Sequence, residues 1–182
     1  MSSAVIPAVT SLANSPSATP RRVRKVVFDG IGLFSKADKA EFLAKYAPEI
    51  APDEYGRQFV WAWHFVRDQM LYFPYFRKTP ACARNQPMAS PERLHRTVVE
   101  VLKALTTYHK GYRASFRHDD RARLPLITHP TFCMASEDDP LSAGVAEAAV
   151  LVKNSRHAIL SSERVPGGAA TKAAAIAAFL DA

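Results

Sequence analysis

Apolar residues along this chain follow two different spacings, and the change between them divides the sequence. Residues 22–28 form a short β-forming run that ends at Asp29-Gly30, which is typical of a strand entering a turn. From residue 35 to 118 the apolar residues recur every three or four positions, which predicts helices. Short strands and helices alternate again after residue 118. The pattern therefore predicts an α/β fold with few strands, interrupted by a large helical insertion.

Three helices are expected in the helical stretch. The first covers Lys36 to Tyr46 and is stopped by Pro48. The second covers Asp53 to Phe73, and one predicted face of it consists of Phe59, Trp63, Val66, Met70 and Phe73. The third begins at Ser90-Pro91-Glu92, where a capping serine precedes a proline at the first helical position. Its apolar residues are expected to be Leu94, Val98, Val101, Leu105 and Tyr108, with Gly111 as a stop.

The second helix carries more aromatic residues than one stripe requires. Trp61 and Phe65 flank the predicted stripe, and His64 lies beside Trp63. Such an excess of aromatic side chains can line a pocket for a moderately apolar ligand. We therefore consider Trp61, Trp63, His64 and Phe65 as substrate-pocket residues, with ordinary core packing as the alternative.

An apolar run from Leu124 to Leu141 ends abruptly in carboxylates. The residues expected in a strand buried on both faces are Leu126, Ile127, Phe132, Cys133 and Met134. Pro125 and Pro130 mark its entrance, because proline lacks the donor that a strand interior needs. Asp139 follows the run, and a carboxylate just past a parallel strand lies where open α/β sheets bind ligands. A solvated turn is the alternative.

The remaining segment has a simpler pattern. We expect a helix over Ala143 to Val152, a strand over Arg156 to Leu160, and a loop at residues 165–168. Thr171 would cap a final helix whose buried side carries Ile176, Phe179 and Leu180.

Composition narrows the class of protein. With 182 residues, of which 48% are hydrophobic and 23% charged, the chain suits one globular domain with an insertion. The net charge is +7, but apart from residues 21–25 the basic residues are scattered, so we expect no nucleic-acid partner. Cys82 and Cys133 form no metal-binding pattern, and no cofactor is indicated. No signal peptide or membrane span is recognisable, which predicts a soluble, cytoplasmic protein.

Three passages resemble the C-terminal half of an α/β-hydrolase. ATPRRVRKVVFDG (18–30) is similar to the sixth strand of that family and the passage leading into it. HPTFCMASEDDPL (129–141) is similar to the seventh strand and its acid loop, and TKAAAIAAFLDA (171–182) to the last helix. The resemblance implies an irregular segment over residues 1–20, a core strand and turn over 21–34, a helical cap over 35–118, and core strands and helices over 119–182.

The resemblance also implies a nucleophile, a histidine and an orienting carboxylate. Asp139 matches the position of that carboxylate, and Asp29, at the end of the sixth strand, is an alternative acid. His157 is the nearest match to the histidine, although it falls within the strand pattern SRHAIL. Ser3 falls nearest the position of the nucleophile, but it lacks the glycines of the G-x-S-x-G elbow.

These matches imply an incomplete active site. A complete relative would cleave an ester, amide or similar bond in a small-molecule substrate, whereas this chain by itself should be inactive. Strands that the family buries would become edges, so an oligomer that covers them is possible. The alternative is a non-catalytic binding or interaction module derived from the hydrolase fold.

Overall fold

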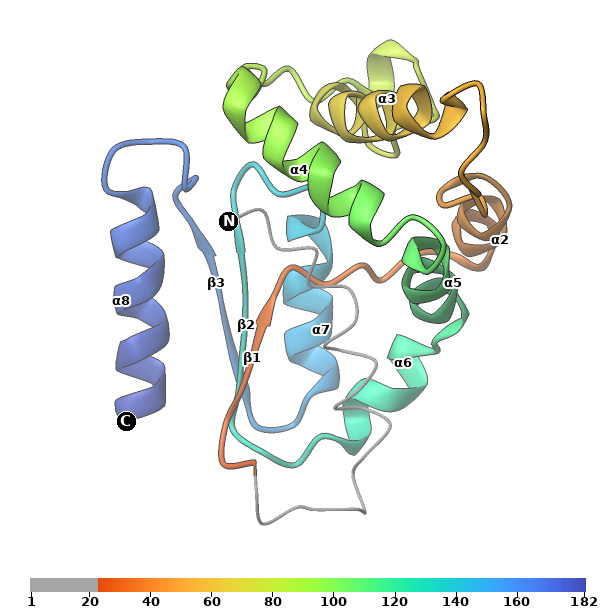
Figure 1. Cartoon of the computed structure of the whole chain (residues 1–182). Helices are drawn as coiled ribbons and strands as arrows, with labels where there is room; N and C mark the ends of the chain where they lie inside the picture. The colour runs from red at the N-terminus through yellow and green to blue at the C-terminus, as the bar shows by residue number, and fades with distance from the viewer. Residues whose placement is uncertain (1–22) are drawn as a thin grey trace. The chain divides into compact units, whose positions relative to one another are not determined.

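The computed structural model describes residues 23–182, and these form two compact units. The first unit combines the residues up to Ser35 with His118–Ala182, and the second is Lys36–Arg117. The chain thus leaves the first unit after its first strand and returns to it for the remaining strands (Figure 1).

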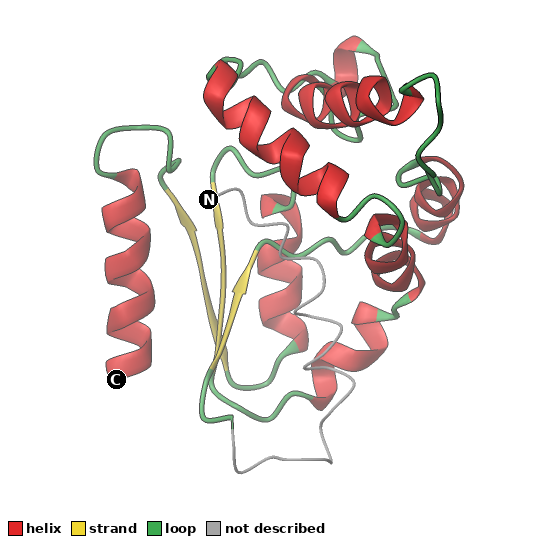
Figure 2. Ribbon diagram, viewed as in Figure 1, coloured by secondary structure: helices red, strands yellow, loops and turns green. Residues whose placement is uncertain are grey.

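The first unit contains a sheet of three parallel strands (Figure 2). These are β1 (Val26–Asp29), β2 (Thr131–Ser136) and β3 (Ser155–Leu160), in that spatial order. In the register between them, Phe28 lies opposite Cys133, and Cys133 lies opposite His157. Parallel neighbours need long connections. The second unit occupies the connection between β1 and β2, and α7 (Val145–Leu151) the one between β2 and β3.

Both faces of this sheet are covered by helices, and Figure 1 shows α7 and α8 (Gly168–Asp181) on opposite faces. Phe28 and Cys133 pack with Val145 of α7 in one apolar cluster. Phe132 packs with Phe179 of α8 in another. Every residue of β2 is consequently buried, as a central strand covered on both faces requires.

Shorter elements complete the first unit. They are the helix α6 (Asp120–Arg123) and the 3₁₀ turns η2 (Leu124–Leu126) and η3 (Ser142–Gly144). Arg121 joins three segments, because it binds the Glu147 carboxylate at 2.6 Å and donates to the carbonyl oxygens of Leu33 and Phe34. This arginine therefore fastens the segment after β1 to α6 and α7.

The second unit consists of four helices and one 3₁₀ turn. They are α2 (Lys36–Lys45), α3 (Arg57–Leu71), η1 (Pro80–Cys82), α4 (Pro91–Lys103) and α5 (Tyr108–Arg117). Their core is a cluster of aromatic rings packed mostly edge to face, an arrangement favoured by the charge distribution of the rings. The rings at its centre belong to Phe42, Tyr46, Phe65, Tyr75, Tyr112 and Phe116.

Several predicted elements are confirmed. The first helix of the second unit covers Lys36–Lys45, and the Ser90 hydroxyl caps α4 by accepting from the backbone N–H of Arg93 at 3.3 Å. The strand at residues 155–160 and the helix before it also match the predicted segments. These elements have strong local signals, which explains why the sequence reveals them.

Several local predictions are wrong. The third helix does not reach Leu105 and Tyr108, because α4 ends at Lys103 and Tyr108 begins α5. Leu180 is not on the buried side of the last helix, since it is 50% exposed.

Leu126 is not in a strand, because residues 124–126 form a 3₁₀ turn and β2 begins only at Thr131. Gly111 does not end a helix, since α5 runs through it. Thr171 does not cap α8, which begins three residues earlier after Gly167, a glycine with a left-handed φ of 82°. Glycine and proline mark boundaries in a sequence without showing which side of the boundary a neighbouring residue occupies, which explains the errors at Leu126 and Gly111.

The buried face of α3 also differs from the predicted one. Ala62, Phe65 and Val66 are buried, whereas Phe59 and Trp63 are exposed. Two polar residues, Gln58 and Asp68, share the buried face. Both have partners, because Gln58 Oε1 accepts from the Asp53 N–H at 3.2 Å and Asp68 pairs with two cations. Periodicity alone could not identify this face, because α3 is apolar on two sides.

Candidate functional site

Acidic residues gather at the carboxyl edge of the three-stranded sheet. Asp29 is the last residue of β1, and residues 137–139 directly follow β2. Because the strands are parallel, their carboxyl ends meet at one edge. This edge is where the sequence predicted ligand chemistry.

Asp139 is held by its own turn. Its N–H donates to the carbonyl oxygen of Ser136 at 2.9 Å, and its Oδ1 accepts from the N–H of Leu141 at 2.8 Å. The other carboxylate oxygen, Oδ2, lies 3.1 Å from the position that a Cβ on Gly30 would occupy. Gly30 has a left-handed φ of 77° and donates to the Met134 carbonyl oxygen at 2.7 Å. The Asp139 carboxylate is therefore fixed over the end of β1.

The two preceding acids have different partners. Glu137 Oε1 accepts from the backbone N–H of Ser162 at 3.2 Å, and Asp138 lies 3.4 Å from the Arg164 guanidinium. Both contacts join the loop after β2 to the loop after β3. The three consecutive acids thus divide into two that tie the loops together and one, Asp139, that faces β1.

Asp29 belongs to an ionic cluster. Lys172 of α8 places its Nζ 2.6 Å from Asp29 Oδ2 and 2.5 Å from Glu163 Oε1. Burial disfavours the charged form of Lys172, but the hydrogen bonds that it donates to Asp29 and Glu163 outweigh this effect and raise its pKa. The second oxygen of Asp29, Oδ1, is buried without a hydrogen-bond partner. This edge of the sheet therefore holds one carboxylate oxygen that is shielded from water and unsatisfied.

Sequence reasoning missed Lys172 and Glu163. Lys172 lies in the second turn of α8, beyond the first turn in which the helix dipole acts, so its position in the helix gave no signal of a buried acidic partner. Nothing local indicated which acid it binds.

His157 and Asp139 are not brought together. His157 pairs with Cys133 in the middle of the sheet, three positions before the Ser136–Leu160 pair at the carboxyl edge. At about 3.3 Å per residue, His157 lies roughly 10 Å below that edge. Its side chain is exposed on β3. Ser3 lies outside the described residues.

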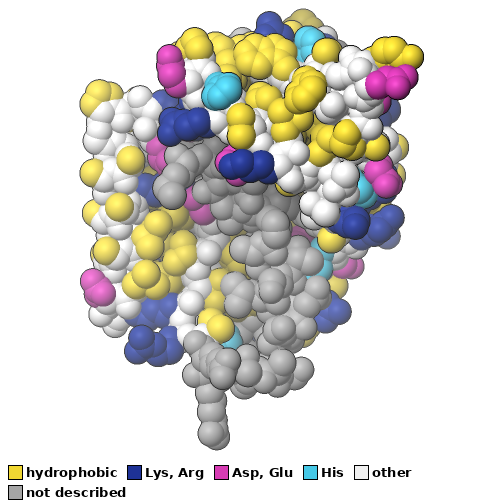
Figure 3. Space-filling view, in the orientation of Figure 1, with side chains coloured by type: hydrophobic (Ala, Val, Ile, Leu, Met, Phe, Trp, Pro, Cys, Tyr) yellow, Lys and Arg dark blue, Asp and Glu magenta, His cyan; other side chains and the backbone are white. Residues whose placement is uncertain are grey.

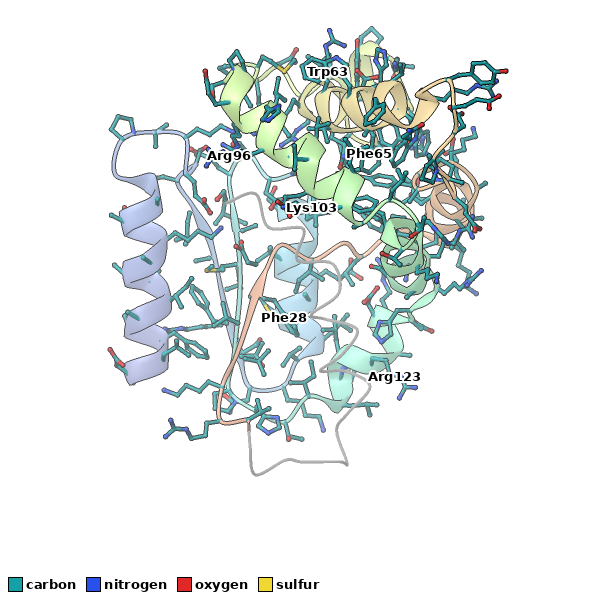
Figure 4. All side chains as sticks on the ribbon, in the orientation of Figure 1. Phe28, Trp63, Phe65, Arg96, Lys103 and Arg123 are labelled. Atoms are coloured by element: carbon teal, nitrogen blue, oxygen red, sulfur yellow. The ribbon has the colours of Figure 1, made fainter. Side chains whose placement is uncertain are left out.

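The four candidate pocket residues of α3 divide between two surfaces, and Figure 4 shows Trp63 and Phe65 on opposite sides of the helix. Phe65 is 1% exposed, and Trp61 stacks on it with ring centroids 4.9 Å apart. Trp63 and His64 are exposed. The first pair packs with the core of the second unit, and the second pair faces away from it.

Two further observations concern cofactors and membranes. Among residues 23–182, no group of three or more histidine, cysteine, aspartate or glutamate side chains could hold a metal ion. Within the same residues, none of the helices has the length and apolar character needed to cross a membrane.

Comparison with known proteins gives matches at the level of structure. No protein-family model matches the chain, and no curated protein gives a significant match. The chain is similar to a hydrolase from Pseudomonas aeruginosa PA01, with 20% identity, a TM-score of 0.51, and coverage of 97% of this chain and 62% of that one. It is similar to an acetylester hydrolase from Corynebacterium glutamicum, with 14% identity, a TM-score of 0.56, and coverage of 96% and 58%. A third similar structure, an alpha/beta hydrolase from Sphaerobacter thermophilus DSM 20745, has 14% identity, a TM-score of 0.48, and coverage of 94% and 63%.

These likenesses extend over nearly all of this chain. The chain nevertheless spans less than two thirds of the length of the first two structures, 62% and 58%. The parallel sheet, its two covering helices and these matches together show that the chain has part of the α/β-hydrolase fold.

Proposed function

We propose that this chain is the C-terminal part of a hydrolase that cleaves an ester, amide or similar bond, with Asp139 as the carboxylate of a Ser-His-Asp type site. The observation that carries the proposal is the fixed carboxylate of Asp139 at the carboxyl edge of the sheet. In such a site the carboxylate orients a histidine and stabilises its charged form. A carboxylate held by its own turn suits that role, because its orientation does not depend on the substrate.

Asp139 suits this role better than Asp29 does. The Lys172 ammonium 2.6 Å from Asp29 neutralises its charge, which weakens its ability to stabilise an imidazolium. Asp29 Oδ1 is nevertheless buried and unsatisfied, so it could accept a hydrogen bond from an incoming donor. Asp29 therefore remains the alternative acid.

The other parts of the reaction do not come from the described residues. A serine on a sharp strand-to-helix turn and an oxyanion hole are required, and His157 lies in the middle of β3. The isolated chain should accordingly be inactive.

Residues 35–118 would form the cap over the active site, and the substrate would be a small molecule. An acetyl ester is the first substrate to test, given the likeness to an acetylester hydrolase.

The test is hydrolysis of p-nitrophenyl acetate by two proteins: the purified 182-residue chain, and the same chain joined to any in-frame segment encoded upstream. We expect the chain alone to give no turnover above a heat-denatured control. We expect the joined protein to turn over, and Asp139→Asn to lower its rate by about 10⁴-fold, the effect of losing the orienting carboxylate in such triads.

Asp138→Asn is the matched control, because Asp138 is adjacent and bonded to Arg164. It should leave the rate within about threefold, consistent with a surface ion pair. If the joined protein loses activity with Asp29→Asn but not with Asp139→Asn, the orienting carboxylate is Asp29 and not Asp139. A folded joined protein without any turnover would instead favour the non-catalytic binding module.

A further inference from the structure

The two helices that cover the sheet are held to it in different ways. Val145 and Ala148 of α7 are fully buried, and both belong to the larger apolar cluster of the first unit. Within α8, which has 14 residues against seven in α7, the one buried side chain is that of Phe179. Figure 3 shows small hydrophobic side chains spread over the exposed side of α8, at the left of the view. Apolar packing therefore stabilises the position of α7 more than that of α8.

Each end of α8 has a polar contact with a distant segment. Near the start of the helix, the Lys172 ammonium lies 2.6 Å from the Asp29 carboxylate. Near its end, Lys25 Nζ donates hydrogen bonds of 2.9 Å to the carbonyl oxygens of both Phe179 and Leu180. The last carbonyl groups of a helix have no partner within it, so a lysine there satisfies them and also interacts favourably with the helix dipole. We call these two interactions the end contacts of α8.

The two end contacts connect α8 to the two ends of β1. Lys25 directly precedes this strand and Asp29 is its last residue, so they lie about 13 Å apart along it. Lys172 and Phe179 are seven positions apart, which corresponds to about 10 Å along a helix. The start of β1 meets the end of α8, so the two elements run in opposite directions. Because the two spacings are similar, α8 makes both contacts at once in a single position on the sheet.

The ring of Phe179 also lies among charged groups. It contacts the Phe132 ring of β2, with centroids 5.6 Å apart, and the Arg156 guanidinium lies 4.8 Å from the Phe179 centroid. Lys25 Nζ lies 5.6 Å from the same centroid. Interactions between a cation and a ring at a partly exposed position are individually weak. The position of α8 therefore depends on several weak polar interactions, all of which require the helix to lie on the sheet.

We propose that α8 detaches from the sheet as one unit while the rest of the first unit stays folded, and that the two end contacts control this opening. Local opening of this kind is expected where few apolar side chains are buried. Detachment uncovers Phe132 and Met134, which pack with Phe179 in the docked state. It also removes the Lys172 ammonium from Asp29.

The opening changes the charge at the carboxyl edge of the sheet. In the docked state the Asp29 carboxylate is paired with the Lys172 ammonium, and in the detached state it has lost that cation. Lys25 lies at the opposite end of β1, about 13 Å away. A change at Lys25 should therefore alter the surroundings of Asp29 through the position of α8. The position of α8 thus sets the charge of the edge where Asp139 also lies.

Amide hydrogen exchange of the full 182-residue chain, resolved to short peptides by mass spectrometry, tests the proposal. Lys25→Met keeps the apolar stem of the side chain and removes the ammonium. We expect it to increase exchange about tenfold along the whole of α8, including the turns next to Lys172, and to leave α7 and β2 unchanged. The matched control is Arg24→Met, because Arg24 is an exposed cation adjacent in sequence to Lys25. It should leave the exchange of α8 unchanged.

The contact at the other end of α8 provides a reciprocal test. Lys172→Met should increase exchange in the last turns of the helix, near Phe179, by about tenfold or more, since it breaks a mostly buried ion pair. Circular dichroism shows whether each variant is folded, and Lys25→Met alone tests the proposal if Lys172→Met does not fold.

The side-chain carboxyl carbon of Asp29, observed by NMR, reports the charge beside it. In Lys25→Met this signal should move toward its position in Lys172→Met, although Lys25 lies at the other end of β1. Arg24→Met should leave the signal in place. All these measurements use the isolated chain, so their outcome does not depend on whether a completed protein is a hydrolase.

Four results would overturn the proposal. The first is exchange of α8 that is unchanged in Lys25→Met, or faster only in the last turn, which is the pattern of a fraying helix end. The second is exchange that rises equally in α7 and β2, because the first unit would then open as a whole. The third is an Asp29 signal in Lys25→Met identical to that of the unchanged protein. The fourth is an equal effect of Arg24→Met and Lys25→Met, which would assign the opening to net charge.

Discussion

The carboxylate of Asp139 lies against the backbone of Gly30, so closely that a Cβ on Gly30 would stand 3.1 Å from Asp139 Oδ2. The same Cβ would lie 3.4 Å from the side chain of Leu141, whose N–H holds the other Asp139 oxygen. Two segments distant in the sequence thus meet at a position where only glycine fits without adjustment. The close approach makes the geometry of the carboxylate sensitive to residue 30.

Gly30→Ala should destabilise the first unit by about 2–3 kcal/mol. About 1–2 kcal/mol comes from the left-handed φ of 77°, and the rest from displacing Asp139. Gly167→Ala separates the two effects, because Gly167 has a φ of 82° but no atom within 4 Å of its Cβ position. Urea unfolding of both variants measures the difference. Equal losses would show that Asp139 moves aside without cost.

Lys172→Met should lower the free energy of unfolding by about 2–3 kcal/mol. The change leaves both carboxylate oxygens of Asp29 without the Lys172 ammonium at a position where the Asp29 side chain is only 21% exposed. Lys103→Met removes an exposed ion pair with Glu100 and should cost less than about 0.5 kcal/mol. Urea unfolding measures both, and similar losses for the two variants would contradict a structural role for the cluster.

Cys133 should resist thiol reagents while Cys82 reacts. Cys133 is fully buried in β2, and burial raises the pKa of its thiol to about 11. Compared with an ordinary cysteine thiol, this pKa lowers the thiolate fraction at neutral pH by a factor on the order of 100, before any effect of access. Ellman's reagent should therefore label one thiol quickly, and Cys82→Ser should abolish that fast phase. A fast phase that persists in the Cys82→Ser variant would show that Cys133 is reached and that β2 opens readily.

Alkaline pH should unfold the second unit. Burial raises the pKa of four clustered tyrosines, to about 12 at Tyr75, and the others are Tyr46, Tyr108 and Tyr112. A raised pKa means that the unfolded chain releases its proton first, so stability is complete below pH 10 and falls as the pH rises further. Each tyrosine contributes a loss of about 1.4 kcal/mol per pH unit between pH 10 and its folded pKa.

Absorbance at 295 nm and near-ultraviolet circular dichroism, followed together above pH 10, measure this loss. The tyrosinate signal of the buried rings should appear only as the dichroism disappears. Tyr112→Phe keeps the ring and removes one titrating group, so the decline in stability with pH should become shallower. Complete tyrosine ionisation by pH 11 with the dichroism intact would contradict the prediction.

Local sequence signals were enough to predict most of the helices and strands and their order along the chain. Apolar runs bounded by glycine and proline, and helical spacing with a capping serine, depend on neighbours within a few positions, so the helix from Lys36, the start of the helix after Ser90 and the strand over Arg156 to Leu160 could be read correctly. The same local signal placed Asp139 just beyond a buried strand. The α/β-hydrolase resemblance followed from these elements, although the role of Asp139 stays a prediction.

Which residues meet depends on contacts between distant segments, and these could not be predicted from the sequence. The register of β3 on β2 places His157 beside Cys133 rather than beside Asp139, and strand register depends on pairing between segments, not on either segment alone. The contact of Lys172 with Asp29 likewise joins the last helix to the first strand. Helix α3 is the clearest case: it is apolar on two sides, so its sequence permits either to be buried, and only packing selected Phe65 over Trp63.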